Sequence, residues 1–221
     1  MKNQKITVQY MAVTGMLCAL SFVAVLIGRI VPNVAGFLSY DPKDVVVVIA
    51  GFIYGPLTSL IISVIVSFIE MITISATGPY GFIMNIVSTC SFAIPAAIVY
   101  KKLHTHKGAV GGLALGVVVM AICMVLWNYI VTPYYMGVPR ETVASMLATV
   151  FLPFNLGKGG VNMGLALLLY KPIVGALRKA KLLPPSTSNG EKKVFNANFT
   201  ITAVAVLLTF TLLLLVMMDV I

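Results

Sequence analysis

Three polar residues, spaced so that one helix face would carry all of them, interrupt an apolar stretch of the sequence. Asn155, Lys158 and Asn162 stand at positions i, i+3 and i+7, which places them on a common helix face. A lysine at the centre of a membrane helix costs about 2.5–3.5 kcal/mol, so its retention there favours a function. Amide and ammonium groups that converge can hold a small ligand by hydrogen bonds. The alternative is that Lys158 reaches for the membrane surface or pairs with an acid such as Asp41.

Glycines surround this lysine, and a proline precedes it. Gly157, Gly159 and Gly160 remove side-chain bulk, so that either a neighbouring backbone or a flat ligand can approach closely. Pro153 predicts the start of a helix. The polar residues would then lie in the outer half of that helix.

Further polar residues fall near the same ends of the neighbouring apolar runs. They are Tyr40 and Asp41 in the first long connection, Asn85 near the start of one run and Asn128 near the end of another. For each asparagine, ligand contact and hydrogen bonding between helices stay open, because a buried amide needs partners in either case. The opposite ends carry only flanking Lys and Arg. This asymmetry predicts a pocket open to the outside.

The elements that position these residues are membrane-spanning helices. Of the 221 residues, 60% are hydrophobic and 10% are charged, whereas a soluble domain has about 25% charged residues. The apolar runs cover residues 10–31, 45–54, 57–76, 80–100, 109–131, 146–170 and 199–218. Runs of this kind are long enough for a spanning helix of about 20 residues, except the second. We therefore expect an all-α integral membrane protein.

The basic residues fix the expected topology, because Lys and Arg concentrate in cytoplasmic loops. They gather near the N-terminus, at 101–107 and at 171–193. All three segments lie on one side only if the chain turns at Gly55-Pro56, which leaves the second span short. That span must be tilted, extended or shielded within the bundle. The predicted N-terminus is cytoplasmic, with outside loops near 32–44, 70–80 and 132–144.

The expected organisation has three parts. Residues 1–181 form a six-helix substrate-binding transmembrane domain, and residues 182–198 form a polar cytoplasmic linker. Residues 199–221 add a C-terminal transmembrane helix that serves for anchoring or packing. In the first helix, Gly15 and Ala19 form a small-xxx-small pair, which suits either docking of a partner helix or packing within the bundle.

The sequence lacks the motifs or patterns that several other functional classes require. The sequence has no Cys-x-x-Cys, Gly-x-Ser-x-Gly or His-Glu-x-x-His pattern, so we expect no enzyme. Its basic residues form no continuous patch for nucleic acid. An ion-coupled carrier would need intramembrane acids along a pathway, and the acids here fall near the ends of the apolar runs. None of these three classes is favoured.

Five segments carry a resemblance to a known family: 40–44 (YDPKD), 51–56 (GFIYGP), 78–85 (GPYGFIMN), 132–135 (TPYY) and 152–160 (LPFNLGKGG). The chain resembles the substrate-binding S-components of energy-coupling factor (ECF) vitamin transporters, most closely the riboflavin-specific members. The resemblance implies a six-helix bundle that captures its vitamin from outside, with the loop Pro32–Lys43 as a gate.

The resemblance also implies roles for particular residues and partners. Asn155 and Lys158 match the family's ligand-binding motif, and Asn128 matches a binding asparagine near the end of the fifth helix. Gly15 and Ala19 would dock on a transmembrane coupling subunit, which assembles with two ATPase subunits in the cell membrane. The pattern does not include the helix at 199–218. Riboflavin would be the transported substrate rather than a cofactor.

The chemistry of the candidate residues is compatible with a flavin. Asparagine can donate and accept together, as the polar edge of an isoalloxazine requires, while lysine only donates. A phosphate would favour a further cation, and only Arg29, Lys43 and Arg140 are available on the outer side. Free riboflavin is therefore preferred. The alternatives are FMN, another vitamin, or an independent small-molecule carrier.

Overall fold

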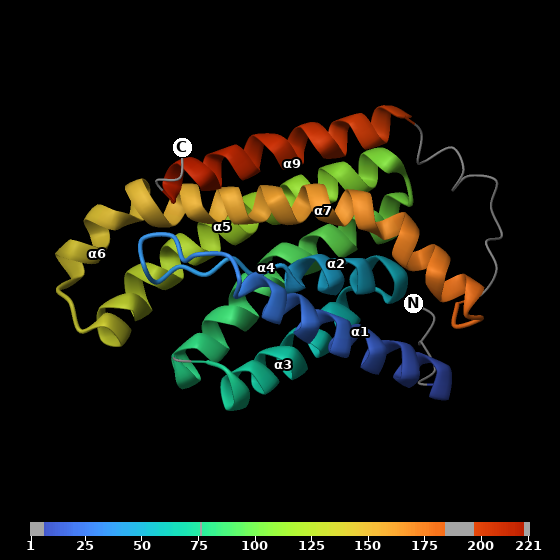
Figure 1. The fold of residues 1–221 in the computed structure, drawn as a ribbon, viewed down its shortest axis with the longest axis horizontal. Helices are drawn as coiled ribbons and strands as arrows, with labels where there is room; N and C mark the ends of the chain where they lie inside the picture. Colours follow the sequence, from blue (N-terminus) through green and yellow to red (C-terminus); the bar gives the residue numbers. More distant parts are fainter. Residues whose placement is uncertain (1–6, 76, 184–196, 219–221) are drawn as a thin grey trace.

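The computed structural model describes residues 7–75, 77–183 and 197–218 and is almost entirely helical there (Figure 1). The helices are α1 (Val8–Gly28), α2 (Lys43–Tyr54), α3 (Pro56–Thr73), α4 (Gly78–Leu103), α5 (His106–Met136), α6 (Arg140–Met146), α7 (Leu152–Lys179) and α9 (Ala197–Met217), with a π-helical segment at Leu147–Phe151. Six helical stretches within the described ranges are long and apolar enough to cross a membrane. The predicted all-α membrane fold is confirmed.

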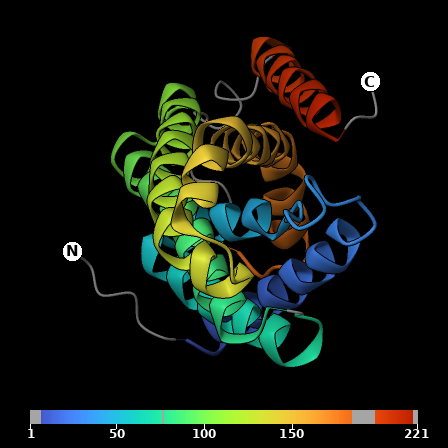
Figure 2. The ribbon, with the colours of Figure 1, turned by 90° about the vertical axis from the view of Figure 1, so that its left-hand side faces the viewer.

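Helix α2 is short and lies inside the bundle. Its 12 residues extend about 18 Å at 1.5 Å per residue, well below the roughly 30 Å of a hydrocarbon core. Four consecutive residues, Val47 to Ala50, have no exposed surface, and Figure 2 shows α2 surrounded by the other helices. The sequence left open whether this short span is tilted, extended or shielded within the bundle, and in the structure it is shielded.

The predicted turn between α2 and α3 is present at Gly55-Pro56. Gly55 has φ of 101°, a backbone conformation that glycine adopts without a Cβ clash. Pro56 follows at the first position of α3, where its missing N–H has no helical partner to lose. The chain therefore reverses direction without an intervening loop.

The predicted outside loop at 132–144 is wrong in its extent. Helix α5 continues to Met136, and α6 begins at Arg140. The helix ends where Gly137, with φ of 65°, donates its N–H to the Pro133 carbonyl, a common left-handed C-terminal cap. Only residues 137–139 lie outside helices in this connection.

Pro153 lies in the first turn of α7, as the sequence predicted, but no loop precedes this helix. The backbone is already helical from Arg140, and a π-helical segment comes immediately before α7. In that segment the Leu152 N–H donates to the Leu147 carbonyl, five residues back. A wider turn of this kind accommodates a proline, which lacks an N–H and crowds the preceding turn.

Helix α9 packs against α7 in the antiparallel direction (Figure 1). It begins at the end of the bundle where α7 finishes and ends beside the start of α7. Most of the predicted linker at 182–198 lies outside the described residues, so the three-part organisation stays a prediction. At the same end, Gln9 Nε2 donates to the carbonyls of Lys181 and Leu182 at 3.1 and 3.0 Å.

The small residues of α1 divide between two environments. Gly15 and Ala19 are exposed, and a Cβ placed on Gly15 would meet no atom within 4 Å. Gly28, by contrast, is buried, and a Cβ there would lie 2.8 Å from the Tyr40 carbonyl oxygen. The first pair is thus free for a partner, while Gly28 serves packing within the bundle.

Candidate ligand-binding site

A cavity of about 350 Å³ lies at one end of the bundle, within the range of about 300–1,000 Å³ for small-molecule sites. The loop that leads from α1 to α2 contributes much of its lining, together with residues of α3, α4, α5 and α7. All six predicted binding residues line this cavity: Tyr40, Asp41, Asn85, Asn128, Asn155 and Lys158. Four stretches of sequence are therefore brought to one place.

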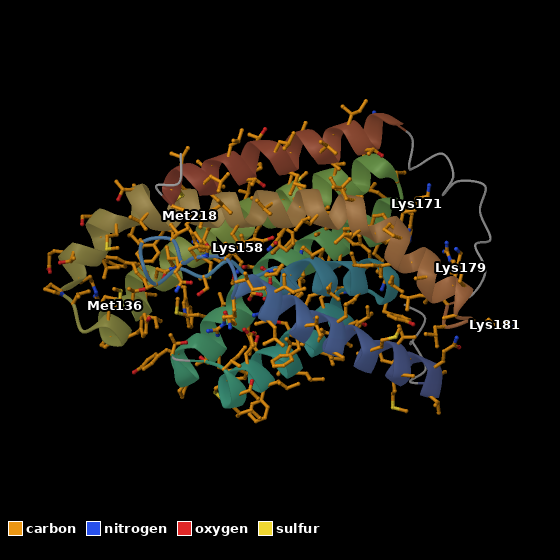
Figure 3. All side chains as sticks on the ribbon, viewed as in Figure 1. Met136, Lys158, Lys171, Lys179, Lys181 and Met218 are labelled. Atoms are coloured by element: carbon orange, nitrogen blue, oxygen red, sulfur yellow. The ribbon has the colours of Figure 1, made fainter. Side chains whose placement is uncertain are left out.

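The cavity and the basic segment that contains Lys171, Lys179 and Lys181 lie toward opposite ends of the molecule. Figure 3 shows Lys158 on the side of Met136, while Lys171, Lys179 and Lys181 are at the far end. This arrangement agrees with the asymmetry of charge in the sequence. It separates the polar interior of the bundle from the basic end.

Lys158 is buried and pairs with an acid while lining the cavity. Its side chain is 7% exposed, and its Nζ lies 3.3 Å from Asp44 Oδ2 and donates to Ser88 Oγ at 3.1 Å. It does not reach for the membrane surface. The acid-pairing alternative holds, but with Asp44 in place of Asp41. Since the ammonium group also faces the cavity, pairing and ligand contact are compatible.

Two of the cavity asparagines, Asn128 and Asn155, are held by the same kind of local hydrogen bond. The Nδ2 groups of Asn128 and Asn155 donate to the carbonyls of Met124 and Phe151, both at 2.7 Å. Each carbonyl is four residues earlier on the same helix, so these bonds orient the amide without joining helices. Asn128 Oδ1 also accepts from Thr132 Oγ1 at 2.9 Å.

Asn155 keeps more of its hydrogen-bonding capacity free. Within the described part of the chain, its Oδ1 accepts no hydrogen bond. An amide oxygen that lines a cavity can accept a hydrogen bond from a ligand or from water there. Asn155 therefore offers an acceptor beside the Lys158 donor.

Asn162 shares the helix face with Asn155 and Lys158, as predicted, but has a different role. Tyr40 donates its hydroxyl to Asn162 Oδ1 at 2.8 Å. Asn162 Nδ2 in turn donates to the Asp41 carbonyl at 3.1 Å and to Asp44 Oδ2 at 3.3 Å. One side chain of α7 thus fastens the end of the loop that covers the cavity.

A buried charge cluster lies beside the cavity, and sequence reasoning missed it. The Lys43 ammonium contacts Asp41 and lies 2.5 Å from Glu70 Oε2, and Lys43 has no exposed surface. Asn85 Nδ2 extends the cluster at 3.4 Å from Glu70 Oε2. The expectation that Lys43 is available to a phosphate is therefore wrong. The acids do lie near helix ends, as predicted, but they are buried there. Buried ions are stable only when paired in this way.

A third acid, Asp44, contacts both Lys158 and Asn162. It has no exposed surface and accepts from Thr89 Oγ1 at 2.6 Å, in addition to its contacts with Lys158 and Asn162. Asp41, Lys43 and Asp44 stand at the start of a helix that is too short to span the membrane. This pattern is the sequence signal that could have predicted the burial of Asp41 and Asp44. Charges at the end of a shielded helix must themselves be shielded.

The two loop residues at the cavity have shifted pKa values. Burial, and then the carboxylates of Asp44 and Asp41, raise the pKa of the Tyr40 phenol, so it remains a hydrogen-bond donor. Burial alone would raise the pKa of the Asp41 carboxyl, but the ammonium groups of Lys43 and Lys158 outweigh this effect and lower it. Asp41 is thus an anion that accepts hydrogen bonds.

The glycines around Lys158 admit neighbouring helices rather than a ligand. A Cβ on Gly159 would lie 2.8 Å from Met120 Cε of α5. On Gly157 and Gly160 it would lie 2.7 Å from Leu214 Cδ2 and 2.0 Å from Phe210 Cγ, both of α9. The structure thus decides between the two uses that the sequence left open.

A helical membrane bundle with a cavity at one end, lined by amides and a paired lysine, has the architecture of a membrane protein that binds a small molecule. Its family follows from comparison with known proteins. The model of the family described as the substrate-specific component of ECF transporters matches residues 9–170. This chain belongs to that family, which confirms the predicted class and excludes an enzyme.

Individual relatives agree with the family. The riboflavin transporter FmnP of Bacillus subtilis (strain 168) is 29% identical over 187 residues, covering 79% of this chain and 98% of FmnP. The riboflavin transporter RibU of Staphylococcus aureus (strain TCH60) is 29% identical over 171 residues, covering 75% and 90%. A solved structure of the S component of a bacterial ECF transporter has a TM-score of 0.66 at 27% identity and covers 77% of this chain and 98% of that one.

Proposed function

We propose that this chain captures riboflavin from outside the cell and delivers it through an ATP-driven ECF transporter. The observation that carries the proposal is the meeting of Asn155 and Lys158 in a cavity of about 350 Å³, in a family whose relatives FmnP and RibU are named riboflavin transporters. Riboflavin is the transported substrate, and no separate cofactor is proposed.

The groups around the cavity suit a flavin. Isoalloxazine has a polar edge that alternates carbonyl and N–H groups, and this edge matches the free acceptor of Asn155 and the donor of Lys158. Apolar side chains suited to the faces of the ring also line the cavity: Phe37, Met84, Met124 and Phe154. Tyr40, Asp41, Asn85 and Asn128 complete the proposed site with further polar contacts.

FMN is the second candidate, and the charges of the cavity weigh against it. Lys43 is committed to Asp41 and Glu70, and the Arg140 guanidinium lies over the Tyr129 ring at 5.4 Å. Arg29, which is exposed and lines the cavity, remains as a cation for a phosphate. We therefore expect FMN to bind more weakly than riboflavin, as competitive titration of the two flavins would measure.

The proposed partners are an ECF transmembrane coupling subunit and two ATPase subunits. Gly15 and Ala19 form the proposed docking pair, because they are exposed on α1 and free of contacts that would obstruct a partner. The chain itself lacks a Gly-x-x-x-x-Gly-Lys-[Ser/Thr] loop, so the ATP would be hydrolysed elsewhere in the complex. An independent carrier would instead transport without partners.

The proposed location is the cell membrane, with the N-terminus in the cytoplasm. The positive-inside rule assigns the basic end to the cytoplasm and thus opens the cavity to the outside. The six-helix unit would span residues 1–181, and the linker at 182–198 would lie inside. The extra helix would return the C-terminus to the outer side.

The test is a riboflavin titration of the chain purified in detergent, followed by the quenching of flavin fluorescence. Saturable quenching near one site per chain is expected. Asn155→Ala should weaken binding by about 10- to 100-fold, as a lost buried hydrogen bond of about 1–3 kcal/mol implies. Thr149→Ala, an exposed change in the preceding helical segment, is the matched control.

Three results would overturn parts of this proposal. Absence of quenching by folded protein would move the substrate to another vitamin. Unchanged affinity in both Asn155→Ala and Lys158→Ala would reject the site. Transport by the purified chain in vesicles, without partners or ATP, would reject its role as a subunit.

A further inference from the structure

Helix α9 lies outside residues 9–170, the part of the chain that the family model matches, and nothing in the proposed function uses it. Its contacts give it a specific place. It runs antiparallel to α7, and three glycines of α7 each receive one α9 residue: Gly164 faces Leu207, Gly160 faces Phe210 and Gly157 faces Leu214.

The approach of the two helices is close enough to fix their register. A Cβ on Gly164 would lie 3.0 Å from the backbone nitrogen of Leu207, and one on Gly160 would lie within the Phe210 ring. Small residues at such spacing are the usual means by which membrane helices pack tightly. Helix α9 is therefore seated in a defined groove rather than lying loosely against lipid.

The outer end of α9 reaches the loop that covers the cavity. Leu214, 8% exposed, shares an apolar cluster with Val34 of the loop and with Phe154 and Val161 of α7. Partly buried side chains pack against this cluster from both sides, namely Leu38 and Tyr40 of the loop and Met217 and Met218 at the end of α9. Figure 3 shows Met218 on the same side of the molecule as Lys158.

The loop segment involved is the one that forms the cavity wall. Val34 and Leu38 exchange two backbone hydrogen bonds, at 2.9 and 3.0 Å, which close a small hairpin. Leu38 and Tyr40 line the cavity, and Tyr40 is fastened to Asn162 on its other side. The loop is thus held between α7 and the end of α9, with ligand space directly beneath it.

We infer that α9 is a positioning helix that holds the loop Arg29–Pro42 closed over the cavity and thereby slows ligand release. The inference rests on the proposed function for the identity of the ligand but not for the position of the loop. The loop can open only if Val34, Leu38 and Tyr40 leave their apolar cluster. Helix α9 contributes one wall of that cluster, so weakening its contact makes opening easier.

The experiment compares two leucines of α9 in the full chain. Leu214→Ala removes the buried contact, whereas Leu212→Ala removes the same atoms from a side chain that is 54% exposed. Both changes lower the hydrophobicity of the helix equally, so a difference between them reports packing. Leu214→Val is a milder second variant, which keeps the test decisive if Leu214→Ala does not fold.

Two measurements separate the inference from the proposed function. Amide hydrogen exchange of peptides covering 29–42, without ligand, reports opening of the loop. Riboflavin dissociation, followed by stopped-flow fluorescence, reports release. We expect Leu214→Ala to raise both rates by about tenfold, equivalent to about 1.4 kcal/mol, with Leu214→Val between it and wild type and Leu212→Ala unchanged.

The outcomes are distinguishable. Equal exchange in Leu214→Ala and Leu212→Ala would overturn the inference, because α9 would then only anchor α7. Faster exchange with unchanged riboflavin release would overturn its role in retention. If the wild-type chain binds no riboflavin, the proposed function fails, and hydrogen exchange alone still decides whether α9 holds the loop.

Discussion

Lys158 Nζ lies 3.3 Å from Asp44 Oδ2, and this pair connects the floor of the cavity on α7 to the start of the buried helix α2. The lysine lines the cavity while Asp44 does not. Consequently the same ammonium group is both a structural partner and a candidate ligand contact. These two roles can be separated by changing the partners one at a time and together.

We expect Lys158→Met alone to lower both riboflavin affinity and thermal stability. Removing one member of a buried ion pair leaves the other charge unpaired, which costs about 3–5 kcal/mol. In Lys158→Met combined with Asp44→Asn, stability should largely return, because no uncompensated charge remains. Affinity should stay low, since the donor is still missing. Recovery of binding in the double variant would show that Lys158 acts only through Asp44.

The Lys43 cluster should matter for stability more than for ligand contact. Lys43 has no exposed surface and is paired with Asp41 and Glu70, so Lys43→Met should cost about 3–5 kcal/mol and lower the melting temperature in detergent. Lys102→Met, a change at an exposed lysine, is the control. A melting temperature equal to that of the control would mean that the cluster contributes little to the fold.

Docking through α1 should be separable from ligand binding. A Cβ placed on the exposed Gly15 meets no atom within 4 Å, so Gly15→Leu should leave riboflavin affinity unchanged. It should abolish ATP-dependent uptake and co-purification with the coupling subunit, because close helix contact requires a small residue. Val23→Leu, at another exposed position of α1, should retain uptake. Normal uptake by Gly15→Leu would place the docking surface elsewhere.

The proposed orientation in the membrane can be tested with single cysteines in a background that lacks Cys18, Cys90 and Cys123. A membrane-impermeant thiol reagent added to intact cells should label Glu141→Cys, at the cavity end. It should label Thr105→Cys and the linker variant Ser188→Cys only after the cells are opened. The reverse labelling pattern would show that the proposed topology is inverted and that the cavity does not open to external substrate.

The pattern of apolar runs was sufficient to predict the helical bundle, and the placement of the basic segments added the turn at Gly55-Pro56 and with it the shortness of α2. It was insufficient for the connection around 132–144. The helical Thr132 and the buried Val143 lie there, in a stretch whose mixed polarity resembles a loop. Helix ends depend on local caps such as Gly137, which hydropathy does not register.

The candidate residues were predictable where a single polar group stood out against an apolar background, as Lys158 and Asn155 do. Glu70 and Asp44 stood next to connections, where charged residues are ordinarily exposed. Their burial depends on which helices surround them, and that information is not local. The same limit explains Lys43, whose two carboxylate partners lie on different segments of the chain.

The brevity of α2 has a consequence for how the ligand space arises. Residues Tyr40 and Asp41, just before the start of α2 at Lys43, line the cavity. Helices α4, α5 and α7 supply further lining residues, among them Asn85, Asn128 and Asn155. The volume for a ligand is thus the missing part of a central helix, rather than a gap opened between tightly packed neighbours. A change in the length of this one helix would resize the chamber and would also move Lys43 and Asp44 relative to Glu70 and Lys158.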